Sequence, residues 1–314
     1  MARLPVSEEL LDGAWVGGAP ATRDGDRVVA GGRSVGRVHA DERRIEWSYP
    51  VGAILAPRVR AERALFDAHA PEGTVDPEPA AEAAAWLDAS PRVTPALGRA
   101  LRGIALPIEG ARVLELGGSG EATRGFLAAG ARRVDQLDVS PAMHGRARSR
   151  LTEAERARVV QHTAPGERTP FGDDTFDAVF SRHCVHHMRR PDVFEEARRV
   201  LRPGGWLLFI EPFFPDPVRA AMKLRRRARA AERGTDDPLG GEDLRALRRV
   251  FEGARVVGEP SVRAYVRGAR PLRRLAARAR DWLPGPLVRA VGGRVVVIVP
   301  PQGPASSHAG SSVA

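Results

Sequence analysis

The amino-acid sequence predicts an α/β fold in which a mostly parallel sheet is covered by helices on both faces. From about residue 92 onward, apolar runs of strand length alternate with segments of helical pattern, and this alternation is typical of a parallel sheet. The first run, 112–116, leads directly into a glycine-rich turn that opens a helix. Together these two observations predict a doubly wound sheet.

The strands and helices of this region can be assigned in order along the chain. Strands are predicted where short apolar runs occur, and helices where apolar residues recur with helical spacing. The predicted strands cover 112–116, 134–139, 176–181, 206–211, 254–259 and 294–299. Helices are predicted from residues 121 and 141 onward, over 191–201 and over 242–251.

The remaining parts of the chain differ from this region in composition. Residues 1–91 begin glycine-rich, contain short strand-like pieces at 27–30 and 44–49 and turn helical at 59–70 and 80–87, with three prolines between the two helices. We therefore divide the chain into an N-terminal cap or extension, a main domain at 92–302 with a basic helical insertion at 213–240, and a disordered tail at 303–314.

The net charge of +10 and the pI of about 11.1 raise the question of nucleic-acid binding. Lys223 is the sole lysine, so arginine carries the positive charge, and it is densest at 225–229 and 273–280. Aromatic residues, which would stack on bases, make up only 5% of the chain and do not interleave with these arginines. We interpret both groups as solvated helical faces and expect no specific nucleic-acid partner.

The cysteine content and the length of the apolar runs indicate in which cellular compartment the protein is expected. Cys184 is the single cysteine, which excludes an internal disulfide and a cysteine-rich zinc site. The longest apolar runs, 206–210 and 295–299, are too short to cross a bilayer, and the first residues show no apolar stretch of signal-peptide length. We expect a cytoplasmic protein without a membrane span.

The stretch VLELGGSGE at 113–121 is the most informative part of the sequence. Glycine lets a ligand approach the backbone closely because it has no side chain and tolerates positive φ. Asp138 lies 23 positions beyond Glu115, at the end of the second predicted strand. A carboxylate at that position can accept both ribose hydroxyls of a nucleoside that lies across the strand ends.

Four segments in order resemble the class I S-adenosylmethionine (SAM)-dependent methyltransferases, in particular the small-molecule enzymes of the UbiE type. The resemblance covers about 95–212 and implies a Rossmann-like, seven-stranded, mostly parallel sheet whose last strand is antiparallel. Ser119 and Glu121 stand where the family has its second and third glycines. The segments are ELGGSGE at 115–121, DVSPAM at 138–143, PFGDDTFDAV at 170–179 and RVLRPGG at 199–205.

The resemblance implies SAM as cofactor and a small molecule as methyl acceptor. Glu115 would order the glycine turn and contact the methionine end of SAM, Asp138 would hold the ribose, and Glu167 is a candidate contact to the adenine. The full set of implied cofactor-binding residues is Glu115, Gly117, Gly118, Ser119, Asp138, Val139, Met143, Glu167 and Ser181.

Three histidines follow the fourth predicted strand, where the donor and acceptor sites of the family meet. A base within hydrogen-bond reach helps a hydroxyl or a protonated amine to accept a methyl group. We take His183 and His186 as the candidate catalytic residues and give His187 less weight. No nearby carboxylates complete a plausible ligand set, so we expect no metal.

Other functions stay open on the sequence. An enzyme that uses SAM for a reaction other than methyl transfer, an RNA-modifying methyltransferase and a non-catalytic SAM-fold subunit are the alternatives within this fold. An NAD-dependent oxidoreductase is disfavoured by Glu115 before the glycines and by the turn at 199–205. We expect the N-terminal region and the basic insertion to build the acceptor pocket, with Trp15, Trp47, Tyr49, Phe213 and Phe214 as its apolar residues.

Overall fold

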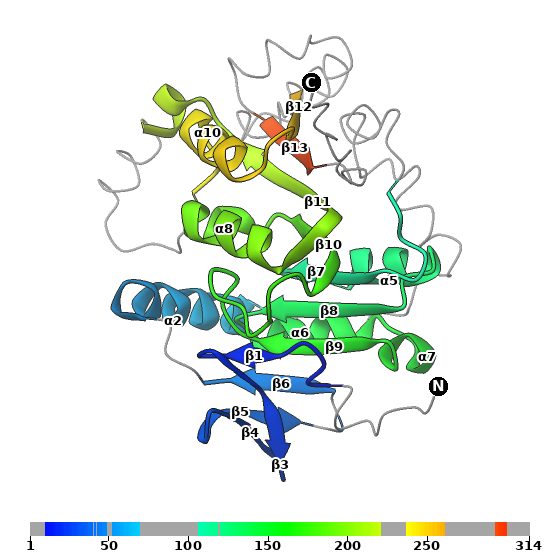
Figure 1. Ribbon diagram of the computed structural model, residues 1–314. Coiled ribbons are helices and arrows are strands. Elements are labelled where there is room, and N and C mark those ends of the chain that lie inside the picture. Colours follow the sequence, from blue (N-terminus) through cyan, green and yellow to red (C-terminus); the bar gives the residue numbers. More distant parts are fainter. Residues whose placement is uncertain are drawn as a thin grey trace, which may run out of the picture.

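A computed structural model describes residues 10–39, 41, 43–48, 52–69, 106–118, 120–220, 237–260 and 293–299 (Figure 1). Four segments that the sequence analysis singled out lie outside these residues. They are the predicted helix at 80–87, the arginine-rich segments at 225–229 and 273–280, and the tail at 303–314.

The described strands form one eleven-stranded sheet and a separate two-stranded hairpin (Figure 1). The order across the large sheet is β12-β13-β11-β10-β7-β8-β9-β6-β5-β4-β3. The hairpin consists of β1 (Trp15–Val16) and β2 (Ala19–Pro20). The strands of the large sheet are β3 (Thr22–Asp24), β4 (Arg27–Ala30), β5 (Arg33–His39), β6 (Arg44–Trp47), β7 (Arg112–Leu116), β8 (Arg133–Asp138), β9 (Val159–Thr163), β10 (Phe176–Arg182), β11 (Leu201–Phe213), β12 (Arg255–Pro260) and β13 (Gly293–Val299).

The sequence predicts a seven-stranded sheet, whereas β7 to β13 are seven strands of a sheet of eleven. Strands β9, β8, β7, β10 and β11 pair in parallel, and β13 lies antiparallel between β11 and β12. Six of these seven strands were predicted; β11 begins at Leu201, inside the segment at 199–205 that was predicted as a turn, because it pairs with β10 from Phe176 onward. The seventh, β9, was not predicted, because its sequence VVQHT contains three polar residues and therefore does not form an apolar run. The strand is nevertheless buried along its whole length.

The N-terminal strands continue the same sheet. Strand β6 pairs in parallel with β9, with Ile45 opposite His162, and β5, β4 and β3 follow as antiparallel neighbours. Residues 22–47 therefore lie at the β9 edge as an extension of the sheet (Figure 1). Because β6 is hydrogen-bonded to β9, it covers an edge that would otherwise expose unpaired backbone groups.

Helices cover both faces of the sheet, as predicted. Adjacent strand residues enter opposite cores, so Val113 and Leu114 are both buried but belong to different apolar clusters. On one face, Phe126 of α5 packs edge-on against Phe180 of β10. On the other face, Phe194 of α8 stacks on Phe209 of β11. The helices are α2 (Gly52–His69), α5 (Glu121–Ala128), α6 (Pro141–Ser149), α7 (Glu153–Arg156), α8 (Arg190–Val200) and α10 (Gly241–Val250), with a 3₁₀ turn at Val185–His187.

A buried carboxylate, Asp135, joins neighbouring strands of this sheet. The side chain is fully buried on β8, and it accepts hydrogen bonds from Arg112 Nε of β7 at 2.8 Å and from Arg133 Nε at 2.9 Å. His162 Nε2 of β9 lies 2.8 Å from its other oxygen. Burial by itself would raise the pKa of Asp135, but the two guanidinium groups and His162 hold it well below its ordinary value of 3.8.

The same network ties the N-terminal segment to the core. Trp47 Nε1 of β6 donates to His162 Nδ1 at 3.3 Å, so the proton of the neutral imidazole is on Nε2, facing Asp135. Burial lowers the pKa of His162 below 6.5, which agrees with a neutral ring. Arg112 also contacts Asp12, 100 residues earlier in the chain. Three strands and the N-terminal segment thus share one set of polar contacts.

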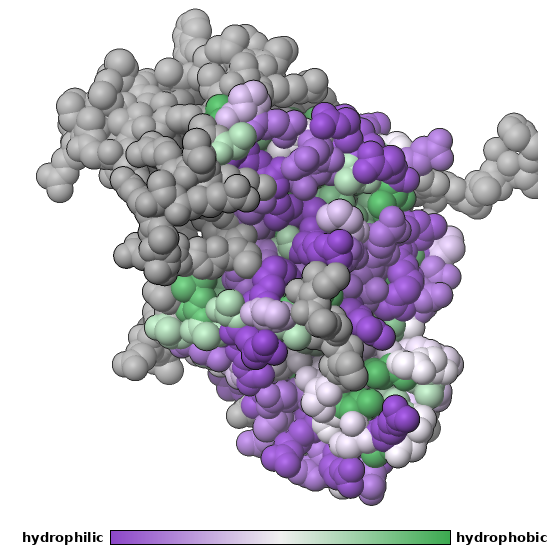
Figure 2. All heavy atoms as spheres, turned by 90° about the vertical axis from the view of Figure 1, so that its left-hand side faces the viewer, coloured by the Kyte–Doolittle hydropathy of each residue, from purple (hydrophilic) through white to green (hydrophobic). Residues whose placement is uncertain are grey.

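The described residues on the face drawn in Figure 2 are mostly hydrophilic, with small apolar areas between them. Trp15, at 47% exposure, is the large apolar side chain that the described residues expose. Among the described helices, none is long and apolar enough to cross a membrane.

Asp135→Asn is expected to lower the free energy of unfolding by about 3–5 kcal/mol, because it leaves two buried guanidinium groups without their carboxylate. Urea unfolding followed by circular dichroism at neutral pH measures this change. Asp26→Asn is the matched control: Asp26 pairs with Arg37 at 3.4 Å, but both side chains are more than half exposed, and such pairs contribute about 0–1 kcal/mol. Equal effects of the two substitutions would contradict the role assigned to the network.

Candidate active site

The glycine turn after β7 depends on one close contact. Gly117 has φ of 72°, a conformation that side chains rarely adopt. A Cβ atom on this residue would overlap Cβ and Sγ of Cys184, which follows β10. Gly117 is therefore needed both for the direction of the turn and for the packing of two strand ends against each other.

Glu115 stabilises this turn through hydrogen bonds to the neighbouring helix and strand. Its buried carboxylate accepts hydrogen bonds from the Thr123 hydroxyl of α5 and, at 3.3 Å, from the Gln136 amide of β8. A Cβ atom on Gly118 would lie 3.0 Å from the Glu115 carboxylate. Neither Glu115 nor Gly118 lines the pocket described below, and Ser119 lies outside the described residues. These contacts fit the expectation that Glu115 orders the glycine turn; its expected contact with the methionine end of SAM stays a prediction.

Asp138 ends β8 at the carboxyl edge of the sheet. Its Oδ1 accepts a hydrogen bond from the Ser140 backbone N–H at 2.8 Å. Burial raises the pKa of Asp138 from 3.8 to about 7, more than its backbone hydrogen bonds lower it. The side chain lines a pocket, so a ligand with hydroxyl donors would supply the partners that favour the ionised form.

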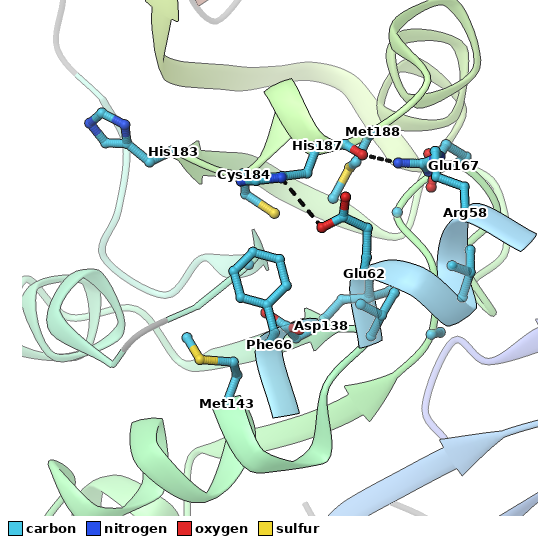
Figure 3. A pocket seen from close by; sticks show the side chains of 16 residues that line it. Arg58, Glu62, Phe66, Asp138, Met143, Glu167, His183, Cys184, His187 and Met188 are labelled. Atoms are coloured by element: carbon cyan, nitrogen blue, oxygen red, sulfur yellow. Dashed lines mark hydrogen bonds and ion pairs between the residues drawn. The ribbon is translucent and has the colours of Figure 1, made fainter. Parts of the chain in front are cut away.

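The pocket lies where several parallel strands end, and α2 covers it (Figures 1 and 3). The empty space there, including the part that is open to solvent, is about 610 Å³. Arg58, Glu62 and Phe66 are spaced four residues apart on α2 and therefore share one helix face. The described lining residues are Arg58, Val59, Glu62, Phe66, Gly117, Leu137, Asp138, Val139, Met143, Ala164, Gly166, Glu167, His183, Cys184, His187 and Met188.

Arg58 links α2 to the sheet side of the pocket through an ion pair and a hydrogen bond. Its guanidinium forms an ion pair with Glu167, which is 7% exposed, and donates a hydrogen bond to the His187 carbonyl (Figure 3). Glu167 also accepts the backbone N–H of Arg189 at 2.8 Å. The candidate adenine contact thus lines the pocket, and its carboxylate already has two partners.

The three histidines occupy different positions. His183 has φ of 55° and an exposed ring, and in Figure 3 this ring points away from Glu62 and Asp138. His186 is buried outside the pocket lining, with Nδ1 2.7 Å from Glu211 Oε2. His187 lines the pocket and lies edge-on to Phe66, with ring centroids 5.1 Å apart. Its Nδ1 is 3.3 Å from Glu62 Oε2.

Glu211 of β11 organises the segment that carries these histidines. It is fully buried and accepts hydrogen bonds from Ser181 Oγ at 3.2 Å and from the backbone N–H groups of Cys184 and Val185. Burial by itself would raise the pKa of Glu211, but the bond to His186 and these N–H groups lower it. Ser181 therefore faces Glu211 and not the pocket, although the sequence placed it among the cofactor contacts.

The sequence predicted that the N-terminal region contributes to the pocket, but it did not identify which residues of α2 do so. The helical pattern at 59–70 was recognised, but helical spacing alone does not tell which face covers a pocket. Of the aromatic residues expected at the acceptor site, Trp47, Phe213 and Phe214 are buried elsewhere, Trp15 does not line this pocket, and Tyr49 lies outside the described residues. Within the described part of the chain, no group of three or more acidic, histidine or cysteine side chains is arranged to hold a metal ion.

Comparisons with known proteins agree with this geometry. Residues 114–209, less than half of the chain, match a family model described as a methyltransferase domain. The ubiquinone/menaquinone biosynthesis C-methyltransferase of Paracoccus denitrificans is 37% identical over 110 residues, which cover 33% of this chain and 44% of that protein. The 27-O-demethylrifamycin SV methyltransferase of Amycolatopsis mediterranei is 35% identical over 130 residues, 39% of this chain and 47% of that protein.

Solved structures show the fold. The geranyl diphosphate C-methyltransferase of Streptomyces coelicolor A3(2) superimposes with a TM-score of 0.53 at 14% identity, over 81% of this chain and all of that one. The chain spans less than half the length of the curated relatives quoted above. The residues that match the family model, 114–209, contain the glycine turn, Asp138 and the histidine segment.

Gly117→Ala is expected to lower the free energy of unfolding by about 2–5 kcal/mol, from a left-handed backbone cost of about 1–2 kcal/mol and an overpacking cost of about 1–3 kcal/mol. Gly110→Ala is the matched control, because Gly110 has φ of 70° and open space around its Cβ position. Only the backbone cost should appear there. Urea unfolding of both variants measures the difference, and equal losses would contradict the contact between Gly117 and Cys184.

Proposed function

We propose that this chain, in which residues 114–209 form a class I SAM-dependent methyltransferase domain, transfers the methyl group of SAM to a small-molecule acceptor. The observation that carries this proposal is the position of Asp138: a carboxylate at the carboxyl end of β8 that lines a pocket beside the glycine turn. This is the place where a nucleoside lies across the strand ends of a doubly wound sheet.

The residues present fit the parts of SAM. Asp138 offers a carboxylate to the ribose hydroxyls, and Val139 and Met143 offer apolar surface to the adenine. Gly117 keeps the turn free of a side chain, and Glu115 holds that turn in place from outside the pocket.

The chain's own task in methyl transfer is positioning and proton removal. SAM, when bound, supplies the electrophilic methyl carbon. The cover by α2 limits water in the pocket and holds a small acceptor in line with that carbon. His187 is the histidine best placed to take a proton from the acceptor, because it lines the pocket while His186 is bonded to Glu211 and the ring of His183 points away.

The acceptor is expected to enter beside Arg58. A second hollow shares Arg58 and Met188 with the pocket and lies over the start of α8. Its lining is mostly charged, and the interior arginine there, Arg190, is bonded to Asp237 and Asp243.

SAM and S-adenosylhomocysteine (SAH) are expected to bind the wild-type protein with micromolar affinity, and Asp138→Ala should weaken both at least about tenfold, because buried ribose hydroxyls lose their acceptor. Isothermal titration calorimetry measures the affinities, with NAD as the ligand that should not bind. Incubation with SAM and a panel of small molecules, read by mass spectrometry, then identifies methylated products. Binding of NAD in place of SAM would overturn the proposed function.

The affinity for SAH is expected to rise with pH between about 6 and 8. Asp138 has a pKa of about 7 in the free protein, so at pH 6 it is mostly protonated and a bound ribose must displace that proton. Above about pH 8 the carboxylate is mostly ionised in the free protein and the affinity reaches a plateau. Asp138→Asn should give a flat profile in the same calorimetric series; a wild-type profile that is equally flat would contradict the assignment of the ribose to Asp138.

A further inference from the structure

We propose that Glu62 makes the pocket select the positively charged SAM over the neutral product SAH. The inference rests on the proposed function, since it assumes that this pocket binds SAM. It goes beyond that function because it assigns a residue of the N-terminal segment, outside the matched domain, to the discrimination between substrate and product.

The position of Glu62 is the first observation. It lies on α2 between Arg58 and Phe66, is 3% exposed and lines the pocket from the side opposite the strand ends. In Figure 3 its carboxylate points from the helix toward Cys184 and His187. The distance from Glu62 Oε2 to His187 Nδ1 is 3.3 Å, so the carboxylate reaches the middle of the pocket wall.

The balance of charges in the pocket is the second observation. The described lining residues include three carboxylates, Glu62, Asp138 and Glu167, and a single guanidinium, that of Arg58. Arg58 is ion-paired with Glu167, and its guanidinium also interacts electrostatically with Glu62. Three carboxylates thus share one guanidinium, so negative groups outnumber positive ones among the described lining residues, with His187 as the titratable group that faces Glu62.

The pKa of the Cys184 thiol agrees with this excess of carboxylates around the pocket. Burial raises the pKa of Cys184, and the nearby carboxylates Asp138, Glu211 and Glu62 raise it further, while Arg58 opposes them. Cys184 forms the wall of the pocket next to Gly117. A negative potential at this wall stabilises a cation in the pocket and disfavours an anion.

SAM and SAH differ in charge at a single atom. When the methyl group is transferred, the bond between sulfur and the methyl carbon breaks and its electron pair stays on sulfur, so a sulfonium becomes a neutral thioether. The new bond forms between the methyl carbon and the acceptor, whose proton leaves to a base. A carboxylate in a low-dielectric pocket attracts the sulfonium but not the thioether. Glu62 would thus favour substrate binding and product release together.

The experiment compares SAM and SAH binding by calorimetry at pH 8, where Asp138 is mostly ionised. Glu62→Gln should weaken SAM on the order of tenfold and change SAH less than about twofold, because only SAM loses a charge interaction. Glu46→Gln is the matched control: Glu46 also bonds α2, through Arg63 at 2.9 Å, but it lies outside the pocket. This control should leave the ratio of the two affinities unchanged.

Glu62→Asp keeps the charge and should retain most of the preference for SAM. If Glu62→Gln weakens SAM and SAH equally, or if Glu46→Gln shifts the ratio as much, the inference is overturned while the proposed function stands. If the wild-type protein binds neither ligand, the proposed function itself falls. If circular dichroism shows that Glu62→Gln does not fold, the wild-type protein provides a second test. Sinefungin carries an amine in place of the sulfonium. It must bind more tightly than SAH at a pH where this amine is protonated; otherwise the inference is overturned.

Discussion

The fully buried carboxylate of Asp135 constrains the arrangement of the whole sheet. A charge in this position is stable only if donors surround it, and the donors come from β7, from its own strand and from β9. Because Arg112 also reaches Asp12 and His162 also contacts Trp47, the N-terminal segment is held by the same network. Register errors between these strands would leave buried charges unpaired, so the network favours one alignment of the strands.

That alignment sets the positions of the functional groups at the other end of the strands. With β7, β8 and β9 fixed side by side, the residues that follow them reach one edge of the sheet, which brings Gly117, Asp138 and Glu167 around one pocket. Glu211 fixes the segment after β10 in a similar way, through a carboxylate that accepts several N–H groups. The buried carboxylates Asp135 and Glu211 thus hold the strands and the segment after β10, while other carboxylates, Asp138 among them, line the pocket.

Helix α2 converts an open strand edge into an enclosed pocket. Its one face supplies Arg58 to hold the sheet side, Phe66 to cover His187, and Glu62 to place a negative charge between them. The matched methyltransferase domain begins well after this helix, so the cover is a contribution of the N-terminal segment. The N-terminal segment therefore does two things: its strands β3 to β6 extend the sheet, and its helix α2 lines the pocket.

The sequence by itself determined the fold class, six of the seven strands of the main sheet and the position of Asp138, because apolar periodicity and a glycine turn after a strand are local properties. It did not determine β9, whose polar residues Gln161 and His162 are accommodated only by partners on β8 and β6. Nor could it separate His187 from His186 and His183, since neighbours in sequence take different environments once Glu211 and Glu62 approach them. Only the tertiary structure brings α2, which ends 43 residues before β7 begins, over the pocket, because contacts between distant segments leave no periodic pattern in the sequence.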